Sequence, residues 1–236
     1  AFDVSTASYT QSSLVSLQDL YPQGMTFNND GTKMYVIGTS EDHVNEFNLT
    51  TAFDVSSASF AGNSERFFVR SQETSPSAII FNNDGTKMFV TGWNGDYVNE
   101  YSLSTAFDVS SAVFAGNSER FSVVSQETYP EGIQFNNDGT KMFIIGSNGD
   151  EVNEYSLSTA FDVSSASHTQ LFSVAGQDLA PRGLVFNSDG TKMFVVGSQN
   201  DKVYEYSLDN PAVQTVCVND AITNITYNTT GATGIG

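Results

Sequence analysis

Residues 27–34 read Phe-Asn-Asn-Asp-Gly-Thr-Lys-Met, and further copies of this motif begin at Phe81, Phe135 and Phe186. The last copy has Ser188 in place of the second asparagine. Successive copies are 51 to 54 residues apart. A second motif, Ala-Phe-Asp-Val-Ser, recurs with them at Ala1, Ala52, Ala106 and Ala160. Repeats of this length are typical of propellers, solenoids and arrays, in which each unit buries its faces against its neighbours.

Each unit is predicted to contain four short strands. In the first unit these begin with residues 24–27, which lead into Asp30-Gly31, and an Asp-Gly pair between apolar runs indicates a hairpin. The next strand, residues 33–38, is apolar on both faces, so it is expected to be covered on both sides, as in stacked blades. A third strand ends in Glu-(Phe/Tyr)-(Asn/Ser)-Leu, and no window has a helical period. The pattern predicts an all-β propeller of four-stranded antiparallel blades.

The phase of the repeats bears on how the ring closes. The fourth unit stops after its third strand near Leu208, and the chain opens on the Ala1 copy of the second motif. Residues 1–20 are therefore expected to complete the last blade, with residues 14–17 as its outer strand. Three arrangements stay open: a four-bladed ring within one chain, eight blades from two chains joined head to tail, or part of a longer array.

Composition limits the partners. The formal net charge is −18, from 27 acidic and 9 basic residues, so phosphate backbones and anionic lipid surfaces would be repelled. Nucleic acid is therefore not expected as a partner. Because no run of about 18 apolar residues occurs, insertion into a membrane is not expected either. The acidity suits cations, cationic partners or simple solubility. The single cysteine, Cys217, cannot form an internal disulfide.

The repeat resembles a known group of proteins. Residues 27–38, followed by His-Val-Asn-Glu-Phe-Asn-Leu at 43–49, are similar to YVTN-type and related bacterial surface propeller repeats. The resemblance covers residues 1–210 and implies a secreted or cell-surface protein. Residues 211–236 are rich in Thr and Asn and resemble the start of PKD-like, immunoglobulin-like adhesin repeats. We therefore expect a propeller domain at 1–210 and an extension, or the start of a following repeat, at 211–236.

Acidic residues that recur in every unit are expected to serve the fold. Asp30 and its counterparts are interpreted as turn residues, and Asp3, Asp54, Asp108 and Asp162 as acceptors in Asx-type turns of the Phe-Asp-Val-Ser connector. Calcium takes carboxylate, amide and carbonyl oxygens, so it is the one cofactor considered. The Asp-x-Asp-x-Asp-Gly spacing is absent, and no other cofactor is expected.

Catalytic motifs are lacking. The two histidines, His43 and His168, occupy different places in their repeats, and no Gly-x-Ser-x-Gly, Walker-type or His-Glu-x-x-His motif occurs. The chain is therefore predicted not to be an enzyme. A hydrolase or lyase on the same scaffold is the least favoured hypothesis, although acids for a carboxylate pair abound.

The repeats differ mainly in two sets of loops that lie on one face of a propeller. One set leads into the innermost strands and the other joins the second and third strands, and loops on a constant scaffold often carry function. Units two and three are otherwise nearly identical but differ at Trp93/Ser147, Tyr97/Glu151 and Ser75/Tyr129. The predicted ligand-binding residues are Trp93, Tyr97, Tyr21, Tyr129, Arg182, His43, Asp96 and Asp150.

Aromatic rings can cover the apolar side of a sugar while acids bind its hydroxyls. The leading hypothesis is a non-enzymatic binding or adhesion module that recognises glycan or protein through this face. The alternative is a structural spacer or assembly unit of a long surface protein, in which Trp93 merely packs on a neighbouring unit.

Overall fold

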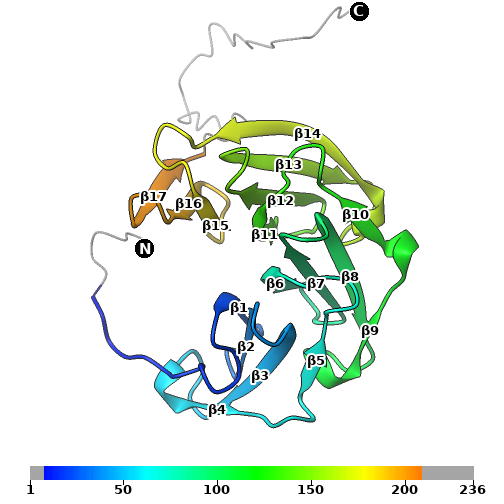
Figure 1. Ribbon diagram of the computed structural model, residues 1–236, viewed down its shortest axis with the longest axis vertical. Helices are drawn as coiled ribbons and strands as arrows, with labels where there is room; N and C mark the ends of the chain where they lie inside the picture. Colours follow the sequence, from blue (N-terminus) through cyan, green and yellow to red (C-terminus); the bar gives the residue numbers. More distant parts are fainter. Residues whose placement is uncertain (1–7, 209–236) are drawn as a thin grey trace, which may run out of the picture.

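The computed structural model describes residues 8–208, which form four antiparallel sheets arranged about one axis as the four blades of a β-propeller. Figure 1 shows the sheets following one another around a central axis in chain order, from the blue blade that contains β1 to the orange blade that contains β17. The predicted fold class is confirmed. Among the described residues, no helix is long and apolar enough to cross a membrane.

The strands lie where the repeats predict them, with the innermost strand first in each blade, but β1 begins at Pro22 instead of residue 24, and blades 1 and 2 each have five strands instead of four. Blade 1 contains β1 (Pro22–Phe27), β2 (Lys33–Gly38), β3 (His43–Leu49), β4 (Ala58–Phe60) and β5 (Arg66–Phe68). Blade 2 contains β6 (Pro76–Phe81), β7 (Lys87–Gly92), β8 (Tyr97–Leu103), β9 (Ala112–Phe114) and β10 (Arg120–Ser122). Blade 3 contains β11 (Pro130–Phe135), β12 (Lys141–Gly146), β13 (Glu151–Leu157) and β14 (Ala166–Ser173), and blade 4 contains β15 (Pro181–Phe186), β16 (Lys192–Gly197) and β17 (Lys202–Ser207).

The Asn-Asp-Gly turn forms because its side chains bond its own backbone. Asp30 Oδ1 accepts from the Thr32 N–H at 3.0 Å, and Asn28 Oδ1 accepts from the Lys33 N–H at 2.9 Å. Gly31 takes the positive φ of 70° that the tight turn requires. The second asparagine links neighbouring blades, since Asn29 Nδ2 donates to the Asn83 carbonyl at 2.6 Å. The turn motif therefore fixes both the hairpin and its neighbour, as predicted for residues that recur in every unit.

The core lies between blades. We call the face of a blade that is turned toward the preceding blade its leading face, and the opposite one its trailing face. Tyr35 and Ile37 on the trailing face of blade 1 pack against Ile79 and Met88 on the leading face of blade 2. Similar clusters join blades 2 and 3 and blades 3 and 4. Strands apolar on both faces are thus buried on both faces, as expected.

The Phe-Asp-Val-Ser connector forms a short 3₁₀ turn in each of the first three units, η2 (Val55–Ser57), η3 (Val109–Ser111) and η5 (Val163–Ser165). A further 3₁₀ turn in blade 2 is η4 (Asn117–Glu119). Asp108 caps η3, its Oδ1 accepting from the Ser110 N–H at 3.0 Å, which confirms the predicted Asx-type turn. The phenylalanine before each capping aspartate has a positive φ and lies on the glycine of its own hairpin turn.

The last blade differs from the prediction. Its sheet has three strands within the described part of the chain, so residues 14–17 do not pair with β17. Residues 8–20 lie instead against blade 1, where Gln11 Nε2 donates to Asp54 and Val15 packs on the cluster of Met34 and Phe47. Successive blades contact each other through β1, β6, β11 and β15, whereas no comparable contact joins β15 to β1 among these residues. The predicted extension at 211–236 lies outside the described residues.

Candidate functional site

The innermost strand of each blade begins with a proline, and the residue after it differs in all four units. These residues are Gln23, Ser77, Glu131 and Arg182. They line a cavity of about 450 Å³ that is shared by all four innermost strands. The channel mouth, as we name this region, combines a constant backbone with four different polar side chains.

Glu131 is the centre of the channel mouth. Its side chain is buried, with a residue exposure of 6%, yet it carries a carboxylate. Oε2 accepts from Trp93 Nε1 of blade 2 at 2.8 Å, and Oε1 forms an ion pair with Arg182 of blade 4. Burial raises the pKa of Glu131, against the opposing effects of the Arg182 charge and these hydrogen bonds. One buried carboxylate therefore ties three blades together.

Arg182 remains partly exposed and has a second anchor. Its Nε donates to Ser198 Oγ at 3.0 Å, and its side chain is 42% exposed. Ser77, by contrast, is buried, and its Oγ donates to the Pro130 carbonyl at 2.7 Å, so it links blades 2 and 3. The reactive groups at the channel mouth are thus a carboxylate with a raised pKa and a guanidinium next to it.

Two of the predicted ligand-binding residues meet here. Trp93 and Arg182 both contact Glu131, although they belong to blades that are not neighbours. Tyr97 does not line the cavity, and its ring is stacked by the Arg120 guanidinium, 4.1 Å from the ring centroid. Of the predicted loop face, Trp93 and Arg182 therefore contact Glu131. The outer aromatic residue, Tyr97, has an intramolecular partner instead.

Tyr21 and Tyr129 are exposed in the loops that lead into β1 and β11. Neither ring lines the channel-mouth cavity. Their backbone groups are structural, since the Thr39 N–H donates to the Tyr21 carbonyl at 3.1 Å and the Tyr129 N–H donates to Glu127 Oε1 at 2.7 Å. These two tyrosines flank the site without entering it.

The remaining predicted residues serve turns. His43 bonds the Glu41 carbonyl through Nδ1 at 2.7 Å and its ring lies 4.9 Å from that of Phe68, and burial lowers its pKa. Asp96 and Asp150 both have φ of 53°, the left-handed conformation that aspartate tolerates in tight turns. Burial, followed by the charge of Glu127, raises the pKa of both. None of the three lines the channel mouth.

Sequence reasoning missed a set of buried carboxylates that hold the two loop sets together. Glu127 accepts from the backbone N–H groups of Tyr129, Asn148 and Gly149, at 2.7, 3.3 and 3.1 Å. The counterparts in the other blades are Asp19, Glu73 and Asp178, each 1% exposed. Their signal in the sequence is an acidic residue three positions before the proline of every unit.

Three acids that do not line the channel mouth form a candidate cation site. Carboxylate oxygens of Glu46, Glu65 and Asp108 lie within 4.8 Å of one another. However, Lys33 Nζ is 2.7 Å from Glu46 Oε1 and donates to the Phe107 carbonyl at 3.1 Å. Because an ammonium group already balances the buried carboxylate, the calcium considered from the connector aspartates has no specific support here.

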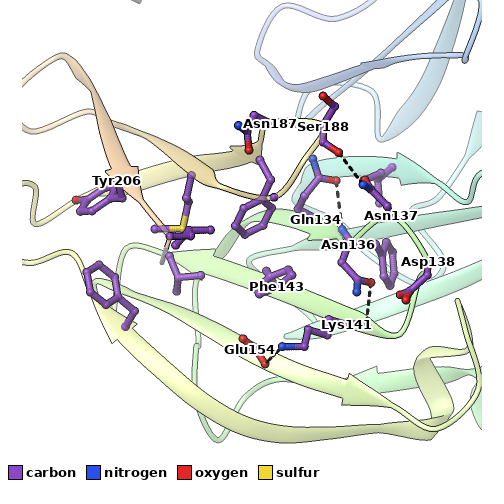
Figure 2. Close-up of a pocket in the computed structure, with 18 of the residues that line it drawn as sticks. Gln134, Asn136, Asn137, Asp138, Lys141, Phe143, Glu154, Asn187, Ser188 and Tyr206 are labelled. Carbon is purple, nitrogen blue, oxygen red and sulfur yellow. Dashed lines mark hydrogen bonds and ion pairs between the residues drawn. The ribbon is translucent and has the colours of Figure 1, made fainter. Parts of the chain in front are cut away.

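A second, larger cavity lies at the opposite end of the strands, beside the Asp-Gly turns of blades 3 and 4. It has a volume of about 980 Å³, and Figure 2 shows Phe143, Lys141, Glu154 and Tyr206 among its lining residues. Lys141 Nζ is 2.8 Å from Glu154 Oε1, and Asn137 Nδ2 donates to the Ser188 carbonyl at 2.8 Å. We call it the blade 3/4 groove.

Comparison with known proteins identifies the class as a β-propeller. No family model matches the chain, and no curated protein matches it in sequence. Among solved structures, it is similar to a proposed 6-phosphogluconolactonase from Bacteroides fragilis, with a TM-score of 0.55 and 15% identity over 80% of this chain and 51% of that one. A second proposed 6-phosphogluconolactonase, from Bacteroides uniformis, has a TM-score of 0.52 and 13% identity over 82% of this chain and 55% of that one.

The β-propeller domain of Cps50 (Swd1) from Myceliophteria thermophila is also similar, with a TM-score of 0.51 and 8% identity over 80% of this chain and 54% of that one. At such identities the likeness shows the fold alone. The chain spans about half the length of each of these three structures. The resemblances to YVTN-type repeats and to PKD-like repeats are not confirmed, because no family model matches.

The prediction of a non-enzymatic binding or spacer module is corrected by these comparisons. Two of the propellers that share the fold carry the name of an enzyme, 6-phosphogluconolactonase. The prediction rested on the absence of nucleophile and metal motifs, but hydrolysis by a positioned carboxylate needs no such motif. Nothing in the comparisons supports adhesion.

Proposed function

We propose that the chain is a propeller hydrolase that opens uncharged sugar lactones or related esters at the channel mouth. The observation that carries the proposal is the contact of Trp93, Glu131 and Arg182, which places a buried carboxylate beside a guanidinium at the edge of a cavity. The names of the two Bacteroides propellers support the reaction class. The secreted or cell-surface location predicted from the repeats would expose this site to extracellular carbohydrate.

Each residue of the cluster has a distinct role in this reaction. The Glu131 carboxylate accepts a proton from the water that attacks the lactone carbonyl, and it returns that proton to the ring oxygen as the carbon–oxygen bond breaks. An Arg182 N–H stabilises the negative charge that develops on the carbonyl oxygen. The Trp93 Nε1–H holds the carboxylate in place from the opposite side, at 2.8 Å.

Electrostatics favour an uncharged substrate over a phosphorylated one. The formal net charge of −18 repels anions, and the guanidinium of Arg182 is already paired with Glu131. A phosphate group would compete with Glu131 for the same arginine. A neutral lactone needs only hydroxyl and carbonyl contacts, which the polar residues of the channel mouth can supply.

The test is the hydrolysis of glucono-1,5-lactone and of its 6-phosphate, followed as acid release against the spontaneous rate in buffer. The intact chain is expected to accelerate hydrolysis of the neutral lactone more than that of the phosphorylated one. Glu131→Gln is expected to lower the rate by about 10²-fold or more, the usual loss of a general base. Glu41→Gln, at an exposed position that does not line the cavity, is the matched control.

The outcomes separate the parts of the proposal. If the intact chain does not accelerate either lactone, the proposed reaction is wrong. Faster hydrolysis of the phosphorylated lactone would overturn the argument from charge. Equal rates for Glu131→Gln and the intact chain would remove Glu131 from the reaction.

A further inference from the structure

The trailing face of blade 4 is an interblade surface that lacks its neighbour. Val196 and Val203 are 44% and 51% exposed, whereas their counterparts in blade 1, Ile37 and Val44, are both 0% exposed beneath blade 2. Val185 on β15 is likewise exposed. The sequence of blade 4 is therefore built to be covered by a further blade, and the described residues do not cover it.

The blade 3/4 groove is a second incomplete feature on the same blade. Between blades 1 and 2 the equivalent space holds the connector of blade 2, where the Phe107 carbonyl accepts from Lys33 Nζ at 3.1 Å and Val109 is fully buried. Between blades 2 and 3 the Phe161 carbonyl accepts from Lys87 Nζ at 2.9 Å. The groove beside Lys141 lies at the equivalent place between blades 3 and 4, and no connector of the described chain fills it.

The space around the glycine of the hairpin turn also indicates that blade 4 lacks a connector. A Cβ atom on Gly85 would lie 2.3 Å from the ring of Phe107, and one on Gly139 would lie 2.2 Å from the ring of Phe161. Around Gly190 in blade 4, no atom of the described chain lies within 4 Å of the same position. The residues directly after Leu208 read Asp-Asn-Pro-Ala-Val and do not contain the motif.

A further copy of the connector motif lies at residues 1–5, before the first described strand. Residues 1–15 match residues 160–174 in order and spacing, from Ala-Phe-Asp-Val-Ser through Thr-Gln to a valine at the fifteenth position of each segment. Residues 160–174 contain η5 and β14, which complete blade 3. Residues 1–15 therefore have the sequence of a connector and outer strand for blade 4, whose β17 has a single neighbour, β16, among the described residues.

The geometry favours delivery of this segment by a second copy. The outer strand of one blade leads directly into the innermost strand of the next, as β14 leads into β15. A segment that completes blade 4 must therefore continue into a blade packed on blade 4. Residues 8–20 lead into β1, but β1 and β15 of one chain share no contact comparable with those between successive blades. The similar solved propellers are about twice as long as this chain.

We propose that two copies of the chain close one eight-bladed ring. The N-terminal segment of each copy exchanges its Gln11–Asp54 hydrogen bond for the blade 3/4 groove of the other copy and adds a fourth strand to its β17, while Val15 stays packed on Met34 and Phe47 of its own blade 1. The leading face of blade 1 then covers Val196 and Val203 of the other copy. The interface is the same blade-to-blade contact that the chain already makes three times within itself, so it requires no new kind of packing.

The experiment is light scattering of the intact chain over a range of concentrations, with Val203→Asp as the disrupting variant. The intact chain is expected to have twice the monomer mass of 25.5 kDa, and Val203→Asp to have the monomer mass with unchanged circular dichroism. Because Val203 is exposed in the single chain, the aspartate does not disturb its folding. Val113→Asp, at a 65% exposed position on β9, is the matched control and is expected to remain a dimer.

A second measurement tests the segment itself. A chain that lacks residues 1–15 is expected to be monomeric and to bind a labelled peptide of residues 1–15, and Phe2→Ala in that peptide is expected to weaken binding at least tenfold. A monomeric intact chain, an open series of larger oligomers, or equal binding of both peptides would overturn the proposal. None of these readouts depends on lactone hydrolysis, so this proposal and the proposed function fail separately.

Discussion

The pKa of the Glu131 carboxylate is subject to two opposing effects. Burial raises its pKa, while Arg182, Trp93 and Ser147 favour the charged form. Burial is the largest of these effects, so the folded chain binds a proton at Glu131 more tightly than the unfolded chain does. The carboxylate is therefore placed at the channel mouth at a cost to the stability of the folded chain.

The effect of Glu131 on stability can be measured as the pH dependence of the free energy of unfolding. In the pH window between the ordinary glutamate pKa, about 4.3, and the raised pKa of Glu131, the folded chain holds more protons, so its stability falls as pH rises. Glu131→Gln removes this titration. The free energy of unfolding of the variant, relative to the intact chain, is expected to increase from about pH 4 to about pH 7 in urea titrations. A relative decrease would mean that Arg182, and not burial, governs the carboxylate.

At the residue scale, two of the predicted ligand-binding residues, Trp93 and Arg182, contact Glu131. Trp93 and Arg182 could be selected because they differ between otherwise equivalent repeats. Glu131 also differs from its counterparts in the other repeats, which are Gln23, Ser77 and Arg182. It was not selected, because one more acidic residue is not conspicuous in an acidic chain. Asp96 and Asp150, which were also selected from the loop differences, have the left-handed backbone conformation and do not line the channel mouth.

In blades 1 and 2 the lysine that follows the Asp-Gly turn binds the connector of the next blade. Lys87 Nζ is 2.7 Å from Glu100 Oε1 and also donates to the Phe161 carbonyl of the following connector. Glu100 is buried, and burial raises its pKa despite the lysine. Lys33 and Lys87 therefore link neighbouring blades as well as balancing a buried carboxylate.

Removal of this lysine is expected to have different effects in different blades. Lys87→Met leaves the Glu100 carboxylate buried without a counter-charge, which is expected to cost about 3 kcal/mol of unfolding free energy. Adding Glu100→Gln to the same chain is expected to recover part of that loss. Lys192→Met is the matched control, because its partner Glu205 is 32% exposed, and it is expected to cost about 1 kcal/mol or less. Equal losses at both positions in urea unfolding would contradict this account.

At the element scale, local sequence signals predict the strands and most of the pairing between them. Asp-Gly turns and doubly apolar strands predicted β1, β2 and β3 and their counterparts. The outer strand is less regular: blade 1 divides it into β4 and β5, whereas blade 3 has the continuous β14. The position of residues 8–20 was not predictable from the repeat, because the same segment fits any blade that lacks an outer strand, and which blade it joins depends on contacts far apart in the sequence.

At the scale of the whole molecule, ring closure brings together surfaces that carry the same sign of charge. Each copy has a formal net charge of −18, so two copies repel each other until counterions screen them. The surfaces that meet are apolar, with Val196 and Val203 on one side. Association is therefore driven by apolar burial and opposed by long-range electrostatics.

Salt is therefore expected to strengthen the dimer. The Debye length falls from about 30 Å at 0.01 M salt to about 10 Å at 0.1 M, which removes most of the repulsion and leaves the apolar contact unaffected. The dissociation constant from sedimentation equilibrium is expected to decrease at least tenfold over this range, while Val203→Asp stays monomeric throughout. If salt instead separates the copies, complementary charges hold the interface, and the trailing face of blade 4 is not the surface that closes the ring.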